Sequence, residues 1–126
     1  KNYNLKKEKC LIRKEVTMTN YIPIITRGYS RKISLDEIMY LEQRQRRLAI
    51  VTEKDTFLFY ERLENLEKLL DERFYKSLKK LRVNIENILV AEDQKITFVN
   101  GTTLHLGRES YIRTNQIYSA YLKKLI

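Results

Sequence analysis

The segment KITFVNGTTLHLG (95–107) carries the strongest β-hairpin signal in the chain. Asn100 and Gly101 suit the two central positions of a type I′ turn, where both residues need a positive φ. Apolar and polar residues alternate on both sides of this pair, as expected of half-buried antiparallel strands. The segment therefore predicts a hairpin and favours a fold built from short antiparallel strands.

Other β-rich runs follow along the chain. They are YIPIIT (21–26), KISL (32–35), DEIMYLEQ (36–43), RLAIVTEK (47–54), DTFLFYE (55–61) and NILVA (87–91). The run 36–43 is expected to begin with one helical turn, and 47–54 and 55–61 form a second hairpin near Lys54. Short connections imply antiparallel pairing, and the lack of βαβ alternation excludes a Rossmann-type sheet.

Two segments predict helices. In RLENLEKLLDE (62–72), leucines recur at the spacing of an amphipathic helix, and RESYIRTNQIYSAYLKKLI (108–126) predicts a C-terminal helix. No strand is predicted in 74–84, and no internal repeat stands out. We therefore expect a mainly β, compact antiparallel domain over residues 21–126, with residues 1–20 as a linker or N-terminal extension.

The charge balance favours an anionic partner. The 126 residues carry a formal net charge of +9, which indicates nucleic acid first, then acidic lipid or acidic protein. No apolar run reaches the length of about 18 residues that a transmembrane helix needs. The single Cys10 cannot form an internal disulfide and fits a reducing cytoplasm. The chain also lacks an initiator methionine, which fits a piece of a longer protein.

Catalysis is not expected. No phosphate-binding loop, nucleophile elbow or cluster of metal ligands is recognisable, so we predict no enzyme activity, cofactor or metal. The aromatic residues at strand and helix positions are expected in the core, not as stacking platforms for single-stranded nucleic acid. His105 is expected on a hairpin strand without a metal, and Asn84 is expected to shape a turn.

Three stretches together resemble a known family. They are ISLDEIMYLEQ (33–43), LENLEKLLDERFYKSLKKLRVNIENI (63–88) and ITFVNGTTLHLGRESY (96–111). In order and spacing they are similar to the LytTR (LytR/AlgR-type) DNA-binding domain of bacterial transcription regulators, over about residues 22–124. The resemblance implies a LytTR-like β fold whose loops enter successive major grooves of double-stranded DNA. It also implies paired direct repeats as the site, two copies on the DNA, and in many members an upstream receiver domain of a two-component system.

The resemblance also points to site residues. Three basic segments (44–47, 76–82 and 108–113) supply them, and the base-reading positions fall near Arg46, Lys79 and Arg108. Arginine offers a planar fork to guanine, whereas lysine is a point charge better suited to phosphate. The candidates for phosphate contacts are Arg44, Arg47, Lys76, Lys80 and Arg113.

One stretch departs from the family pattern. Where members usually have Arg-x-His-Arg/Asn-Ser, this chain has Lys76-Ser77-Leu78-Lys79-Lys80. Charge is kept, but the histidine and the serine of the pattern are lost. Two alternatives to sequence-specific DNA binding therefore stay open: a non-specific nucleic-acid or RNA-binding module, and a basic protein-interaction domain.

Overall fold

The computed structural model describes residues 20–126. The predictions for Cys10 and for an N-terminal extension lie outside these residues. Along the chain the elements are β3 (Tyr21–Ile25), β4 (Ser30–Ser34), η1 (Leu35–Glu37), β5 (Ile38–Arg44), β6 (Arg47–Thr52), β7 (Thr56–Tyr60), α1 (Leu63–Leu66), η2 (Glu67–Leu69), β8 (Phe74–Leu78), β9 (Leu81–Asn84), η3 (Ile85–Asn87), β10 (Ile88–Glu92), β11 (Lys95–Phe98), β12 (Thr103–His105) and α2 (Arg108–Lys124). The η elements are single 3-10 turns.

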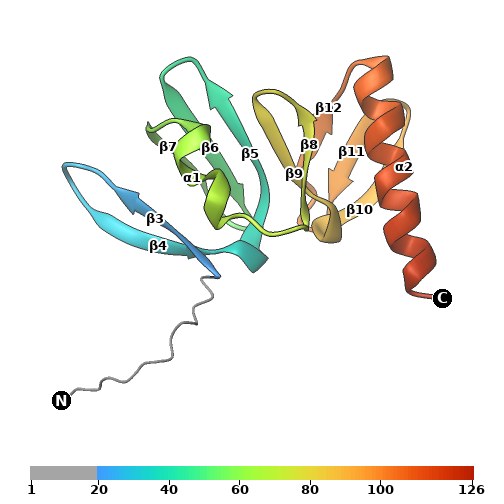
Figure 1. Ribbon diagram of the computed structural model, residues 1–126, viewed down its shortest axis with the longest axis horizontal. Helices are drawn as coiled ribbons and strands as arrows, with labels where there is room; N and C mark the ends of the chain where they lie inside the picture. The colour runs from blue at the N-terminus through green and yellow to red at the C-terminus, as the bar shows by residue number, and fades with distance from the viewer. Residues whose placement is uncertain (1–19) are drawn as a thin grey trace.

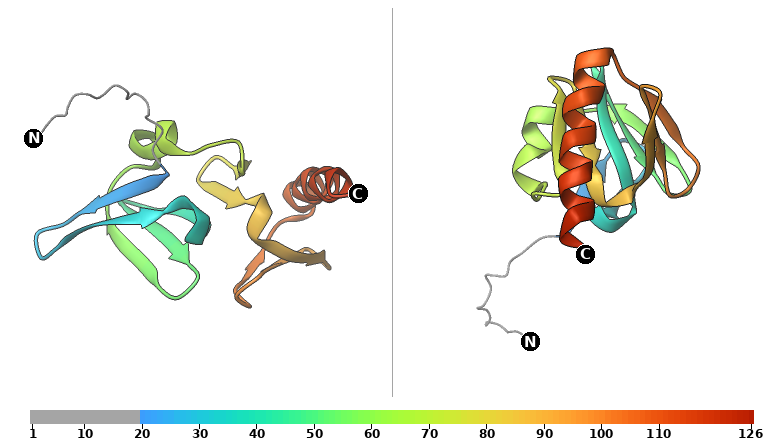
Figure 2. Two further views of the ribbon diagram at one scale, coloured as in Figure 1. Left: turned by 90° about the horizontal axis from the view of Figure 1, so that it is seen from below. Right: turned by 90° about the vertical axis from the view of Figure 1, so that its right-hand side faces the viewer.

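The strands of this part of the chain form three antiparallel sheets. The central sheet has five strands in the order β7-β6-β5-β9-β8, and it is flanked by the β3–β4 hairpin and by the β10-β11-β12 sheet (Figure 1). Figure 2 shows the β3–β4 hairpin packed across from β5 and β6, while α2 lies at the other end of the molecule. The predicted fold class, mainly β with a short helix and a C-terminal helix, is confirmed.

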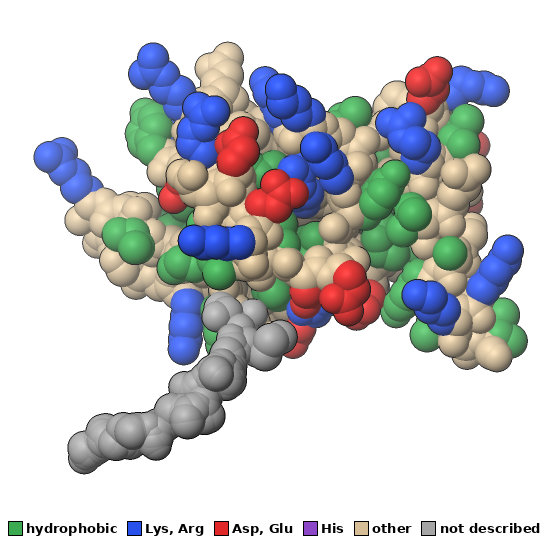
Figure 3. All heavy atoms as spheres, viewed as in Figure 1, with side chains coloured by type: hydrophobic (Ala, Val, Ile, Leu, Met, Phe, Trp, Pro, Cys, Tyr) green, Lys and Arg blue, Asp and Glu red, His purple; other side chains and the backbone are tan. Residues whose placement is uncertain are grey.

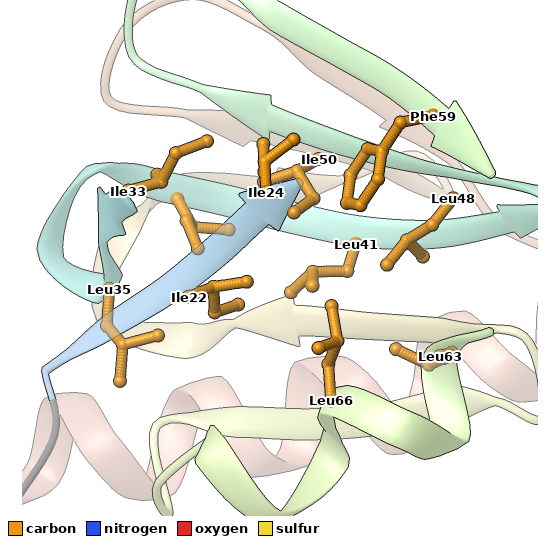
Figure 4. Close-up of a cluster of buried hydrophobic side chains, with 11 residues drawn as sticks. Ile22, Ile24, Ile33, Leu35, Leu41, Leu48, Ile50, Phe59, Leu63 and Leu66 are labelled. Atoms are coloured by element: carbon orange, nitrogen blue, oxygen red, sulfur yellow. The ribbon is translucent and has the colours of Figure 1, made fainter. Parts of the chain in front are cut away.

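The central sheet is covered on both faces. On one face a first core cluster joins it to β3, β4 and α1 (Figure 4). On the other face a second cluster joins it to β10, β11 and α2. Strand β5 therefore has an unbroken run of buried residues from Ile38 to Leu41, as expected of a strand with two buried faces.

The short helix is shorter than predicted. Leucine spacing predicts a helix over 62–72, but α1 and η2 together end at Leu69, and Leu70 is already extended. Leu63 and Leu66 enter the first core cluster, and Leu69 and Leu70 pack against it half-buried. A helix this short depends on tertiary packing, and the extended Leu70 leads the chain toward β8 at the edge of the central sheet.

The hairpin β8–β9 was not predicted. Its turn, Lys79–Lys80, contains none of the residues that usually mark a hairpin turn, and both strands lie in a cationic stretch. The ladder has a register shift between Lys76 and Leu78. Such a bulge bends a strand and changes where its side chains point.

The predicted hairpin at 95–107 is present, but its turn type was wrong. In the described part of the chain, positive φ outside glycine occurs at Gln45, Asp93 and Gln94, so Asn100 does not have it. The two-residue turn with two positive φ angles lies instead at Asp93–Gln94, between β10 and β11.

The side chain of Asn100 makes two hydrogen bonds that account for the different turn type. Its side-chain amide donates to the Glu53 carbonyl at 2.9 Å, and its carbonyl oxygen accepts from the Thr102 N–H at 3.1 Å. The β11–β12 loop is thereby fixed on the β6–β7 turn. This contact outweighs the local preference for a type I′ turn.

A repeated unit is present after all. Residues 33–38 and 83–88 both form a strand end, a 3-10 turn and the start of a new strand. Ser34 and Asn84 occupy equivalent positions, because each side chain accepts a hydrogen bond from the backbone N–H two residues later. Asn84 is fully buried and also donates to the Ile38 carbonyl at 2.9 Å, so the two units are joined. The prediction that Asn84 shapes a turn is confirmed.

Neither α1 nor α2 has the length and apolar character that crossing a membrane would require.

Candidate nucleic-acid interface

Three segments that are far apart in sequence lie along one edge of the molecule (Figures 1 and 2). They are the β5–β6 turn with Arg46, the β8–β9 turn with Lys79, and the start of α2 with Arg108. All three side chains are exposed. Lys and Arg side chains gather along this edge in Figure 3. We call the edge defined by Arg46, Lys79 and Arg108 the basic edge.

The first two turns are fixed to each other by backbone pairing. Strands β5 and β9 are neighbours, with Glu42 opposite Leu81. Beyond this pair, the Gln43 N–H donates to the Lys80 carbonyl at 2.8 Å. The two turns therefore stand side by side.

The side chain of Gln43 stabilises the β5–β6 turn. Its amide nitrogen lies 2.9 Å from the Gln45 carbonyl and 3.0 Å from the carbonyls of Arg47 and Glu61. Its oxygen accepts from the Leu63 N–H at 2.7 Å, which satisfies one backbone donor at the start of α1. From the sequence, Gln43 was only the first residue of a basic connector.

Arg82 fixes the β8–β9 turn from inside. Its guanidinium donates two hydrogen bonds to the Glu67 carboxylate, both at 3.1 Å. A third nitrogen lies 3.1–3.2 Å from the carbonyls of Leu78, Lys79 and Leu81. Only 5% of Arg82 is exposed, and the hydrogen bond from Arg82 lowers the pKa of Glu67.

This pairing divides the cationic stretch 76–82 into two parts. Arg82 is neutralised by Glu67 and serves the fold, so it is not a surface charge of the basic edge. Lys76, Lys79 and Lys80 remain exposed. They are the part of the stretch that a polyanion could reach.

Three buried hydroxyl groups fix the start of α2 against β8. Ser77 and Thr114 are 2.8 Å apart, and Thr114 donates to the Ser110 carbonyl at 2.8 Å, so the Ser77 hydroxyl donates to Thr114. The Ser110 hydroxyl donates to the Ser77 carbonyl at 3.0 Å. This network sets the position of Arg108 relative to the β8–β9 turn.

The network gives a first prediction. The substitution Thr114→Val should lower the free energy of unfolding by about 1–3 kcal/mol, because the buried Ser77 hydroxyl loses its acceptor. Urea denaturation measures this loss. Thr103→Val, at an exposed position of β12, is the matched control. An equal effect of the two substitutions would contradict the role of the network.

Helix stability does not explain Arg108. As the first residue of α2 it lies at the positive end of the helix dipole, where a cation is unfavourable. The preceding Gly107 supplies no side-chain cap, and Glu109 is the acidic residue of the first turn. Arg108 therefore makes no favourable interaction with the dipole of its own helix.

The five candidates for phosphate contacts are all exposed. Arg44 and Arg47 face each other across the β5–β6 turn, and Lys76 and Lys80 belong to the β8–β9 hairpin. Arg44 donates to Glu42 at 2.8 Å, and this hydrogen bond raises the pKa of Arg44. Arg113 is the outlier, since it lies more than one helical turn beyond Arg108 on α2.

A cationic notch separates the first two turns. Its lining includes Gln45, the three exposed cations Arg62, Lys79 and Lys80, and one carboxylate, Glu64, and its volume is about 260 Å³. The Arg62 side chain is 73% exposed and has a 3.5 Å contact with Glu64. Sequence reasoning missed Arg62, because its place at the start of a predicted helix gave no sign that it would face Lys79.

The described residues contain no group of three or more side chains suited to holding a metal ion. His105 is exposed on β12, opposite Lys95.

A mainly β domain with cationic turns along one edge is typical of nucleic-acid-binding proteins. Comparison with known protein families identifies the class more narrowly. The LytTr DNA-binding domain family matches residues 29–126, so the chain belongs to the LytTR family of DNA-binding domains.

A solved structure agrees on the fold. It is described as the LytTr DNA-binding domain of a methyl-accepting/DNA response regulator from Bacillus cereus. It is 20% identical, with a TM-score of 0.59, and the match covers 85% of this chain and 96% of that one. The comparison with curated proteins found no match.

Proposed function

We propose that this domain binds a specific sequence in double-stranded DNA as part of a transcription regulator. The observation that carries the proposal is that the β5–β6 turn, the β8–β9 turn and the start of α2, which carry Arg46, Lys79 and Arg108, line one edge of the molecule. In this proposal the two turns and the start of α2 enter major grooves. Arg46 and Arg108 each present a guanidinium to guanine, and Lys79 makes a weaker contact with a base edge.

Phosphate contacts would position the domain on the duplex. Arg44 and Arg47 flank Arg46, and Lys76 and Lys80 lie in the hairpin that carries Lys79, while Arg113 lies further along α2 than Arg108. To these we add Arg62, whose side chain lines the notch between the first two turns. A DNA backbone lying in this notch would let the β5–β6 and β8–β9 turns reach bases on either side of it.

The regulatory setting belongs to the same proposal. We infer that two copies bind paired direct repeats and that a receiver domain upstream of Lys1 controls them. Footprinting of the binding site would show two protected segments if two copies bind. A single protected segment would agree with DNA recognition by the domain but would contradict binding of two copies to paired repeats.

The function is tested by selecting duplexes from a random pool. We expect an enriched sequence that binds the domain in an electrophoretic shift and outcompetes a scrambled duplex of equal composition. A pool without enrichment, or equal binding to selected, scrambled and RNA duplexes, would contradict sequence-specific recognition and favour a non-specific module.

A second prediction concerns Arg46. The substitution Arg46→Lys keeps the charge but removes the planar fork, so discrimination at one G·C pair of the selected site should fall by about 5- to 100-fold. Affinity for unrelated DNA should stay close to that of the wild type. Titrations against duplexes with single base-pair changes measure this. Arg27→Lys, on the exposed β3–β4 turn, is the control, and full discrimination by Arg46→Lys would contradict a guanine contact.

A further inference from the structure

Leu78 is an apolar residue in an unusual place. It ends β8, directly before the Lys79–Lys80 turn, and it is 48% exposed. It belongs to neither core cluster. Isolated exposed leucines are ordinary on protein surfaces, and Leu89 on β10 is one of them. Leu78 differs because it directly precedes the exposed Lys79 and Lys80 of the basic edge.

The backbone explains why Leu78 points outward. The bulge between Lys76 and Leu78 turns the intervening Ser77 inward, where it bonds to α2. Leu78 pairs with Leu81 across the turn, so both side chains lie on the face of the sheet that carries the second core cluster. Leu81 is buried in that cluster because β9 lies between β5 and β8, whereas Leu78 lies on the edge strand β8 and reaches solvent.

Leu78 is also fixed in position. Its carbonyl accepts from Arg82 at 3.2 Å, and Arg82 is in turn bound to Glu67. An apolar side chain on a rigid backbone loses little entropy when it makes a contact. The arrangement suits recognition better than a mobile loop would.

The lysines decide which partner can cover Leu78. Lys76, Lys79 and Lys80 favour a polyanion, so the partner must offer an apolar group within a negatively charged surface. In the major groove of DNA, the 5-methyl group of thymine is such a group, and apolar side chains contact it. We propose that Leu78 contacts the 5-methyl group of a thymine beside the base pair reached by Lys79. This inference rests on the proposed function and adds a specificity-determining residue to it.

The test changes the DNA and leaves the protein intact. Each thymine of the selected duplex is replaced in turn by deoxyuridine, which removes only the methyl group. For the wild-type domain we expect one position at which affinity falls by about fourfold, the effect of one lost methyl contact. For Leu78→Ala the thymine and deoxyuridine duplexes should bind equally at that position. Leu78→Met, which keeps an apolar chain, should retain the difference.

Leu89→Ala is the matched control, since Leu89 is an exposed leucine away from the basic edge. It should discriminate between thymine and deoxyuridine as the wild type does. The inference is overturned if no single replacement weakens wild-type binding, or if Leu78→Ala discriminates as well as the wild type. If the wild type does not prefer the selected duplex over a scrambled one, the proposed function fails, and the inference fails with it.

Discussion

Affinity for the selected duplex is expected to fall about a thousandfold when monovalent salt rises from about 50 to about 200 mM. Six cations are proposed at phosphates: the five from the sequence and Arg62. Neutralising about six phosphates releases condensed counterions and gives a slope near −5 for log K against log salt. Fluorescence anisotropy over a salt series measures this slope directly.

Substitutions of single cations measure how much each one contributes to the slope of log K against log salt. Arg62→Gln should make it shallower by about one and weaken binding to all duplexes alike. Lys54→Gln removes the same charge from the exposed β6–β7 turn and should leave the slope unchanged. A wild-type slope near zero would contradict a phosphate-binding edge, and an unchanged slope in Arg62→Gln would exclude the notch from the contact.

Replacing Arg82 is expected to damage both stability and binding. The substitution Arg82→Met leaves Glu67 and three carbonyls of the β8–β9 turn without their donor. We expect a loss of about 2–3 kcal/mol in the free energy of unfolding, below the full cost of a buried pair because Glu67 is half-exposed. Affinity for DNA should fall about tenfold, although Arg82 is too buried to touch DNA, because the turn that carries Lys79 loosens.

Two further measurements distinguish the positioning role of Arg82 from the effect of its charge. Amide hydrogen exchange of the turn residues should accelerate in Arg82→Met more than exchange in β11 does. Arg27→Met removes the same charge from an exposed turn and should change neither exchange nor stability. Equal loss of DNA affinity in Arg82→Met and Arg27→Met would show that only net charge matters, and would contradict the positioning role.

The Glu67–Arg82 pair also depends on pH. Because the hydrogen bond from Arg82 lowers the pKa of Glu67 below its ordinary value of 4.5, folding favours the charged carboxylate. The stabilisation is present above that ordinary value and is lost as the pH falls through the lowered pKa. In Arg82→Met this acid-sensitive part of the stability should be missing.

The strand pattern and the C-terminal helix were predictable from sequence because they depend on local periodicity. β-rich composition identified β6 and β7, and the spacing around Tyr118 identified α2. The β8–β9 hairpin was not predictable in this way. Its Lys79–Lys80 turn is held by Arg82, and Arg82 is held by Glu67 from another element. No local preference in the sequence indicates such a pair.

The candidate site was also only partly predictable from the sequence. Resemblance to the family pointed to Arg46, Lys79 and Arg108, but only the fold shows that the segments carrying them share an edge. Arg62 was missed because only the fold places it in the same notch as Lys79. Residues that position the site, such as Gln43 and Thr114, act through contacts between distant elements, and their types alone do not distinguish them from surface residues.

Comparison of two triple variants of equal charge tests the central claim most directly. One changes Arg46, Lys79 and Arg108 to glutamine, and the other changes Arg27, Lys54 and Lys123, which are exposed and lie outside the basic edge. Both lower the formal net charge from +9 to +6. In anisotropy titrations of the selected duplex, the first should lose more than about 100-fold in affinity and the second less than about threefold. Equal losses would show that DNA responds to overall charge and would contradict recognition by the basic edge.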